Sequence, residues 1–243
     1  MLDSTTMRPL AGELLLAAWE AGAAEHDLDR ALTMLATALP DADRGQLGAL
    51  PIAERNVLLL RLHELTFGSL LSVFGVCAAC GAQFEFAVPV GALARQSPVG
   101  QLAWQEEGRH YRLRAVTTDD LLATLGVPEP GAAQDLLLAR CLEMSPAAAL
   151  PAALPAVMPA ARQRFEELNV ASELSCSVDC PGCSSRELLD LDMGRFLWKE
   201  VRTAARRLLG EIHELASAYG WSERAIAGMR PGRRAAYLEM LSA

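Results

Sequence analysis

The chain has 243 residues, of which 51% are apolar and 21% are charged. This length is enough for one sizeable hydrophobic core or two modest ones. Glycine (18 residues) and proline (13 residues) occur at ordinary levels, which excludes collagen-like and low-complexity chains. Aromatic residues make up 5%, a low share for an all-β sandwich and an ordinary one for a helical protein. The net charge of -8 argues against a general nucleic-acid binder, which normally carries a basic surplus.

The sequence also bears on the cellular compartment. Every apolar run ends well short of the roughly 18–20 residues that a membrane span needs. The first ten residues lack the basic, apolar and small-residue regions of a signal peptide. We therefore expect a cytoplasmic protein without membrane contact. In that compartment the six cysteines should be reduced, unless they bind a metal or take part in redox chemistry.

The first third of the chain has a helical pattern. Apolar residues recur every three to four positions in Pro9–Ala21, Asp27–Leu39 and Pro51–Thr66. This spacing places them on one stripe of a helix. We therefore predict an N-terminal helical segment over residues 1–68.

The pattern changes after Gly68. A tight Cys-Ala-Ala-Cys-Gly turn is followed by Phe84, Phe86 and Val88 at every second position, which is a strand signal. Residues Gln101–Thr118 have the alternation and the central turn of a short hairpin. We assign residues 69–118 to a first cysteine knuckle and this β-hairpin.

The next segment, residues 119–171, returns to helical periodicity. Helices are predicted at Asp119–Leu125 and Ala132–Met144, and another around Ala161–Asn169. Between them, Ser145–Ala160 contains four prolines, which predict a linker or a broken helical turn that can act as a hinge.

A second β-like patch, Glu173–Leu191, surrounds another cysteine pair and defines a second knuckle over residues 172–191. The strongest helix signal is Asp192–Tyr219, which has a wide apolar face and ends at Gly220. With two short helices after it, this part forms a C-terminal segment, residues 192–243. The predicted fold is α+β and predominantly α-helical, with helical ends around a small β part.

Two Cys-x-x-Cys pairs are the motif that carries chemistry. A turn of this kind brings two thiolates to one face, and two facing turns form a tetrahedral four-cysteine zinc site. In compact zinc ribbons about 15–20 residues separate the pairs, whereas here 99 residues lie between them. Loop-closure entropy rises only with the logarithm of length, so this interval does not forbid a shared site. We predict one structural Zn²⁺ in a split zinc-ribbon-like site with four ligands: Cys77, Cys80, Cys180 and Cys183.

Two other interpretations of these cysteines stay open. The pairs can be metal-free and reduced, or one can be a redox-active dithiol. Neither pair opens a clear helix after a strand, which is the setting that lowers a thiol pKa. Cys176 can replace one ligand, although Cys180-Pro-Gly-Cys183 has the better turn residues. Cys141 lies in a helical apolar pattern and is interpreted as a small core residue.

The sequence shows no catalytic constellation. It contains no phosphate-binding loop, metalloprotease helix or nucleophile-elbow motif. The four histidines (His26, His63, His110 and His213) are scattered over different predicted elements. Three adjacent acidic pairs, Glu106-Glu107, Asp119-Asp120 and Glu166-Glu167, are interpreted as solvated because neighbouring residues point in different directions. We therefore expect that the protein is not an enzyme.

A basic cluster marks the polar side of the long C-terminal helix. It consists of Arg202, Arg206 and Arg207. Such a cluster is usually a solvated face, but guanidinium groups also bind carboxylates in bidentate fashion. We predict these arginines as a surface for an acidic partner.

Several segments together resemble a known family. They are LLLRLHELTFGSLLSVFGVCAACGAQFEFAVPV, SCSVDCPGC, FLWKEVRTAARRLLGEIHELASAYGWSERAIAGM and the closing RRAAYLEML. They are similar to the baseplate hub assembly chaperones of T4-type tailed phages, as found in gene clusters of phage-like contractile injection systems. Ser184 stands where that pattern has a glycine after the second cysteine pair. At that place a positive φ is needed, which serine reaches less easily.

The resemblance implies a non-enzymatic baseplate assembly factor, chaperone-like, or a structural component of a phage-tail-like particle. Its partners would be other baseplate or tail proteins of the same particle, into which it can be incorporated. Two alternatives come from the cysteines: a zinc-ribbon adaptor that acts on nucleic acid or transcription machinery, and a thiol redox protein. The acidic composition argues against the adaptor.

Overall fold

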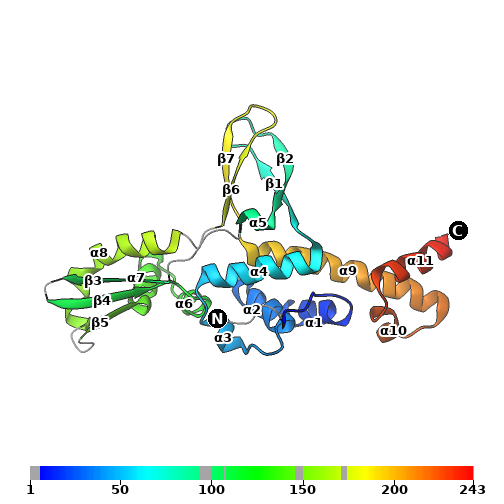
Figure 1. The fold of residues 1–243 in the computed structure, drawn as a ribbon, viewed down its shortest axis with the longest axis horizontal. Helices are drawn as coiled ribbons and strands as arrows, with labels where there is room; N and C mark the ends of the chain where they lie inside the picture. The colour runs from blue at the N-terminus through cyan, green and yellow to red at the C-terminus, as the bar shows by residue number, and fades with distance from the viewer. Residues whose placement is uncertain (1–5, 94–99, 107, 146–149, 171–173, 243) are drawn as a thin grey trace.

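The computed structural model describes residues 6–93, 100–106, 108–145, 150–170 and 174–242. Figure 1 shows a long helical body, an arm that projects from its middle, and a module of strands and helices at one end. Helices dominate and the sheets are small and antiparallel, so the fold is α+β as the sequence predicts. None of the described helices has the length and apolar character that crossing a bilayer requires.

The helical body joins the beginning and the end of the chain. Its elements are α1 (Glu13–Gly22), α2 (Asp27–Ala38), α3 (Arg44–Gly48), α4 (Ile52–Phe67) and α9 (Met193–Tyr219). Each of the longer helices turns one apolar stripe inward, and Leu35, Leu59 and Leu197 are fully buried in the shared core. The carboxylate of Asp192 caps the start of α9, and Gly220 ends it in the left-handed conformation with φ of 69°.

The arm consists of two hairpins that come from distant parts of the sequence. The first pairs β1 (Leu70–Val76) with β2 (Gln83–Pro89), and the second pairs β6 (Ser175–Asp179) with β7 (Arg186–Asp190). A short helix, α5 (Val90–Leu93), lies at the base of the arm (Figure 1). The two hairpins form separate two-stranded sheets. Contacts between side chains, rather than strand pairing, must therefore hold them together.

The third unit is an α/β module at the end of the body. Its elements are β3 (Gln101–Glu106), β4 (Arg109–Arg114), α6 (Thr118–Thr124), α7 (Pro130–Cys141), β5 (Leu142–Ser145) and α8 (Leu150–Asn169). The strands form one antiparallel sheet in the order β3-β4-β5. Leu113, Leu138 and Leu168 bring sheet and helices into a second core. The hairpin that follows the first knuckle in the sequence thus packs in this module and not in the arm.

The prediction that a helix continues to Met144 is wrong. Residues Leu142–Ser145 form β5, which pairs with β4 so that Leu113 faces Leu142. Burial alternates along this strand, with Leu142 and Met144 inside. Four residues are too few for a period of two to stand out after a long helical pattern.

The proline-rich linker is also a wrong prediction from Leu150 onward, because α8 runs through it to Asn169. Pro151 lies in the first turn, where the backbone N–H has no helical partner to lose. Pro155 and Pro159 follow at four-residue spacing, so the missing N–H groups lie along one side of the helix. Residues 146–149 of the predicted linker lie outside the described residues.

The interpretation of Asp120 as solvated is a third error, since only 1% of this residue is exposed. Its carboxylate accepts hydrogen bonds from Arg114 at 2.5 and 3.0 Å, from Arg140 at 2.9 Å and from the Thr117 hydroxyl at 2.8 Å. Burial alone raises the pKa of Asp120, but the hydrogen bonds from Arg114 and Thr117 outweigh it and hold that pKa below its ordinary value. Its neighbour Asp119 is exposed, as predicted. Glu106, Glu166 and Glu167 are exposed too, and Glu107 lies outside the described residues.

The C-terminal tip is formed by the end of α9 with α10 (Glu223–Ala227) and α11 (Pro231–Ser242). The rings of Tyr219 and Trp221 stack at 4.6 Å, and Tyr237 meets Trp221 edge-on at 4.8 Å. The nearly buried Arg234 donates to Glu211 of α9 at 2.8 Å and to the carbonyl of Met229 at 2.6 Å. These contacts fix α11 against α9.

Candidate metal centre

The first cysteine pair lies on the tight turn between β1 and β2. The N–H of Cys77 donates to the carbonyl of Ala82 at 2.9 Å, and the N–H of Gly81 donates to the carbonyl of Cys77 at 2.9 Å. Gly81 has φ of 73°, in the left-handed region that glycine enters freely. This turn places Cys77 and Cys80 at the end of the hairpin.

The second pair lies on an equivalent turn between β6 and β7. The N–H of Cys180 donates to the carbonyl of Ser185 at 2.8 Å, and the N–H of Ser184 donates to the carbonyl of Cys180 at 2.8 Å. Both bonds join residues at the same spacing as in the first turn. The two cysteine turns therefore have the same pattern of backbone hydrogen bonds.

Ser184 occupies the place that Gly81 has in the first turn. Its φ is 59°, and it is the one non-glycine residue with positive φ among the described residues. For an L-residue this conformation costs about 1–2 kcal/mol. The departure from glycine is thus accommodated in the turn, at a conformational cost.

The two turns meet so that all four sulfurs form one group. The Sγ atoms of Cys77, Cys80, Cys180 and Cys183 lie within 4.8 Å of one another. The Sγ of Cys77 is 3.6 Å from that of Cys183, and the Sγ of Cys80 is 3.7 Å from that of Cys180. Zinc–sulfur bonds of about 2.3 Å in a tetrahedron put the sulfurs about 3.8 Å apart. A disulfide needs about 2.0 Å, so the spacing fits four ligands of one metal ion and not two disulfides.

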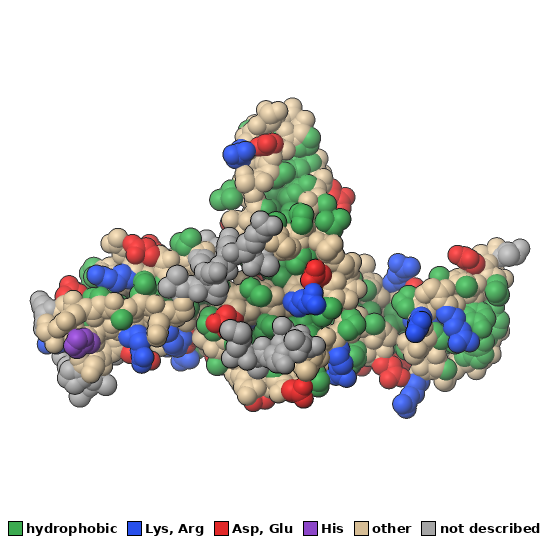
Figure 2. All heavy atoms as spheres, in the orientation of Figure 1, with side chains coloured by type: hydrophobic (Ala, Val, Ile, Leu, Met, Phe, Trp, Pro, Cys, Tyr) green, Lys and Arg blue, Asp and Glu red, His purple; other side chains and the backbone are tan. Residues whose placement is uncertain are grey.

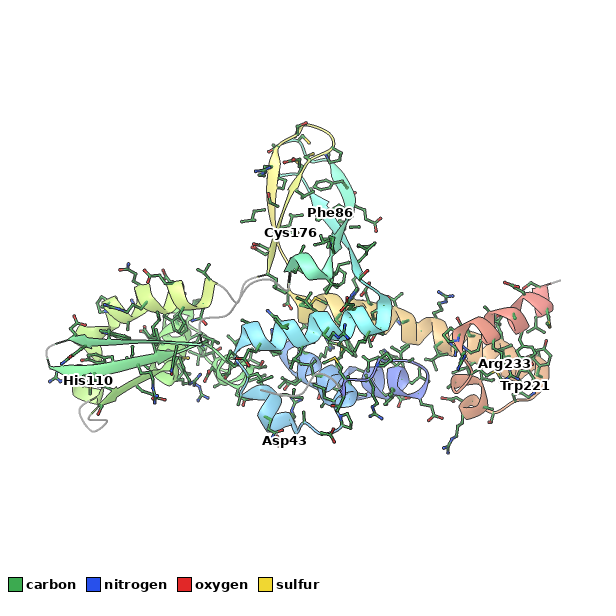
Figure 3. The ribbon with its side chains drawn as sticks, viewed as in Figure 1. Asp43, Phe86, His110, Cys176, Trp221 and Arg233 are labelled. Carbon is green, nitrogen blue, oxygen red and sulfur yellow. The ribbon has the colours of Figure 1, made fainter. Side chains whose placement is uncertain are left out.

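The closest contacts run across the arm, from one hairpin to the other. Gly182 allows this approach, because a Cβ there would lie 3.3 Å from the Cβ of Ala82 and 3.7 Å from the sulfurs of Cys80 and Cys180. In Figure 3, Phe86 and Cys176 mark the facing sides of the two hairpins below the cysteine turns. Among the described residues, no other group of histidine, cysteine or acidic side chains has a metal-site arrangement.

The protein environment differs between the ligands. Cys77 and Cys180 are buried, whereas Cys80 and Cys183 are exposed. Burial raises the pKa of Cys180, but the N–H groups of Gly182 and Cys183 outweigh it and lower that pKa to about 7. The Gly182 nitrogen lies 3.3 Å from the Sγ of Cys180. Backbone donors of this kind stabilise a thiolate, the form that binds a metal.

Glu187 of β7 is a neighbour of the site that the sequence analysis missed. The Cys77 thiol donates to its carboxylate at 3.1 Å, and this hydrogen bond, with burial, raises the pKa of Cys77 to about 12. Glu187 lies at an inward position of β7, between the exposed Arg186 and Leu188. A charged residue at an inward strand position is the signal that could have found it.

The remaining cysteines and histidines lie elsewhere. Cys176 donates to the carbonyl of Leu189 at 3.8 Å and is outside the sulfur group. Cys141 is fully buried in the second core, where burial and the nearby Asp120 raise its pKa to about 12. Both positions agree with the sequence interpretation. His63 is fully buried, with Nε2 2.7 Å from the Glu200 carboxylate, and His213 is exposed on α9.

The predicted basic cluster lies on the helical body. Arg202, Arg206 and Arg207 are all exposed on α9, and Arg207 pairs with Glu211 at 3.1 Å. Within the described part of the chain, Arg202 and Arg206 have no ion-pair partner. The structure places the three side chains together on solvent-exposed positions of one helix.

Comparison of the chain with protein-family models, with curated proteins and with solved structures gave no match. The chemistry of the site follows from its own geometry. Four thiolates around one ion fill every position of a tetrahedron and leave none for water or a substrate. The arrangement can therefore hold a metal that joins the two hairpins of the arm.

Proposed function

We propose that the four cysteines hold one structural Zn²⁺ and that the protein is a non-enzymatic baseplate assembly factor, or a structural component, of a phage-tail-like contractile injection system. The observation that carries the metal assignment is the closed group of four sulfurs from two distant hairpins. A tetrahedral set of four thiolates favours zinc over the harder divalent cations.

The structural role of the ion is supported by the small size of the arm's own hydrophobic core. The separate buried cluster of the arm consists of Cys77, Phe84 and Cys180, whereas Leu71 and Val88 at its base join the core of the helical body. The two sheets share no strand pairing. Such a unit has too little apolar burial to be stable alone. A metal that binds only the folded arm supplies the missing free energy.

A role in protein binding is supported by the outer surface of the arm. Leu70, Phe74 and Val76 of β1 are 58%, 60% and 51% exposed, and Leu188 of β7 is 69% exposed. Figure 2 shows apolar side chains gathered along the arm. Contiguous apolar surface of this kind marks interaction sites in soluble proteins.

The assignment to a baseplate is supported by the resemblance in sequence. The segments that carry it form most of α4, the strands β1, β2 and β6 with both cysteine pairs, and most of the helices α9 to α11. These elements also form the metal centre and most of its support. The proposed partners are other baseplate or tail proteins, which bind through the exposed arm and through Arg202, Arg206 and Arg207.

Two rival functions fit these residues less well. A nucleic-acid adaptor needs a basic surface, but the described residues of the arm carry four carboxylates (Glu85, Asp179, Glu187 and Asp190) and one arginine (Arg186). A thiol oxidoreductase needs an accessible cysteine of low pKa. Here the thiol with the lowered pKa, Cys180, is only 1% exposed.

The deciding experiment is affinity purification of the tagged protein from its native host, with mass spectrometry of what co-purifies. We expect baseplate or tail proteins. The variant R206E/R207E should recover less of them while keeping its melting temperature, because exposed charges contribute little to stability. The matched control is R61E/R112E, which reverses two exposed arginines that each have a glutamate partner, as Arg207 does.

Two results would overturn the proposal. Recovery of RNA polymerase subunits or nucleic acid without any tail or baseplate protein would favour the adaptor. Cysteine-dependent reduction of insulin disulfides well above background would favour the redox protein.

A further inference from the structure

The C-terminal tip carries a set of arginines that is separate from the cluster on α9. Arg224, Arg230 and Arg233 line a surface hollow of about 590 Å³, together with Ala225, Gly228 and Met229. None of the described residues that line this hollow is acidic. Figure 2 shows basic side chains next to apolar surface at this end of the molecule.

These arginines stand on a rigid support. Arg234, which follows Arg233, forms the nearly buried ion pair with Glu211, and the aromatic rings of the tip pack α11 on α9. The guanidinium of Arg233 lies 5.8 Å from the centre of the Tyr237 ring, and Figure 3 shows Arg233 in the tip near Trp221. A fixed scaffold lowers the entropy that a ligand must offset.

The charges in the hollow are poorly compensated by the protein itself. Arg224 lies 3.6 Å from the Glu13 carboxylate with its side chain 90% exposed. Within the described residues, Arg230 and Arg233 have no ion-pair partner. The net charge of the whole chain is -8, yet residues 220–243 contain four arginines against two glutamates. Guanidinium groups that share a hollow repel one another, and carboxylates of a ligand relieve this repulsion through paired hydrogen bonds.

Apolar side chains in the hollow and farther along α11 indicate the kind of ligand. Ala225 and Met229 line the hollow, and toward the far end of α11 Met240 and Leu241 are 66% and 43% exposed. A surface that combines arginines with exposed apolar groups fits a protein segment that offers carboxylates and apolar side chains together. A nucleic acid offers no such apolar groups along its backbone, and the acidic body of this protein repels it.

We propose that Arg224, Arg230 and Arg233 form a docking site for an acidic, amphipathic segment of a partner protein. The inference rests on the proposed function in one respect, namely that the partner is another protein. The proposal adds a second basic docking surface, at the tip, to the one formed by the arginines of α9.

The test is a fluorescence anisotropy titration of the full-length, zinc-loaded protein. The probe is a fluorescein-labelled peptide that repeats Glu-Glu-Leu, and the uncharged control peptide has glutamine in place of glutamate. We expect the glutamate peptide to bind, and R230E/R233E to weaken its binding by about tenfold or more. The control R61E/R112E should leave that affinity within about twofold, because these exposed arginines lie outside the hollow and outside the cluster on α9. Arg234 is left unchanged because its ion pair holds the tip together.

Several results would overturn the proposal. They are no binding of the glutamate peptide, equal binding of the glutamine peptide, or equal binding by R230E/R233E at an unchanged melting temperature. Loss of binding in a further variant, R202E/R206E, with normal binding in R230E/R233E would place the site on α9. A DNA oligonucleotide that displaces the peptide at equal charge concentration would show a general anion surface. Because the probe is synthetic, failure to recover a baseplate protein from the host would leave this result standing.

Discussion

The arm and the α/β module are both small units built on β-hairpins, but they are stabilised in different ways. In the arm the separate buried cluster is Cys77, Phe84 and Cys180, and only the base of the arm shares the core of the helical body. In the module, α7 and α8 cover the sheet, and the core includes Leu113 and Leu138. A predicted metal ion stabilises the arm, whereas packed helices stabilise the module.

The two units offset the entropy cost of folding by different means. Helices that cover a sheet remove apolar surface from water, at about 25 cal/mol per Å². A hairpin pair without such cover needs a cross-link that exists only in the folded state. The arm should therefore depend on metal and thiolates, and the module on packing and on the buried carboxylate of Asp120.

The largest expected effect is loss of the metal from the arm. Purified protein should contain about one zinc per chain, and Cys80→Ser should lower that content and the melting temperature. Structural zinc binds with apparent free energies of about 10–16 kcal/mol, so a lost ligand removes the main support of the arm. Hydrogen exchange should show loss of protection in β1, β2, β6 and β7, while β3 to β5 keep theirs.

The matched control for that variant is Cys176→Ser, in the same arm but outside the sulfur group. It should keep its zinc. No zinc in the protein as purified and after refolding with zinc would refute the site. Equal loss of zinc in Cys141→Ser would mean that a ligand is misassigned.

As the pH is lowered, the arm should unfold before the module. Protons compete with the metal for thiolates, so the arm should release zinc and unfold at a higher pH than the one at which Asp120 is protonated. The pKa of Asp120 is lower in the folded protein than its ordinary value, so its stabilisation is complete above that ordinary value of about 3.9 and is lost as the pH falls below it. Hydrogen exchange at graded pH, with zinc release followed by a chromogenic chelator, gives the order. Unfolding of the module before zinc release would contradict it.

A smaller effect is expected for Asp120→Asn in the module. The amide keeps the shape but leaves Arg114 and Arg140 without their carboxylate, which should cost on the order of 2 kcal/mol. Urea denaturation measures the loss, and zinc content should not change. Asp119→Asn, its exposed neighbour, should remain within about 0.5 kcal/mol of the wild type. If the two variants lowered the free energy of unfolding equally, the buried network around Asp120 would contribute no more to stability than an exposed carboxylate.

The smallest effect compares the two knuckles with each other. Ser184→Gly relieves a positive φ and should stabilise the zinc-loaded arm by up to about 1 kcal/mol. Gly81→Ser imposes the same conformation on the first turn and should destabilise it by a similar amount. The cost is conformational, because a Cβ at Gly81 meets no atom within 4 Å. Thermal unfolding at a fixed excess of zinc tests both variants. The melting temperature must rise in Ser184→Gly and fall in Gly81→Ser.

Much of the local structure could be predicted from the sequence because its signals are local. The two Cys-x-x-Cys turns with alternating flanks indicated both hairpins, and Gly220 marked the end of α9. The choice of Cys180 and Cys183 over Cys176 also followed from turn residues. All four chosen cysteines lie in the sulfur group. The identity of the metal and the function of the chain stay predictions.

The ligand types, the strand alternation of the arm and the periodicity of the long helix follow from the amino-acid sequence, since each depends on residues a few positions apart. Which distant segments meet depends on the folded chain. Folding brings Glu187 to Cys77, buries Asp120 between Arg114 and Arg140, and gathers three arginines around a hollow at the tip. The physical reason is that burial and charge pairing depend on neighbours in space, and a local pattern carries no information about which segment supplies them.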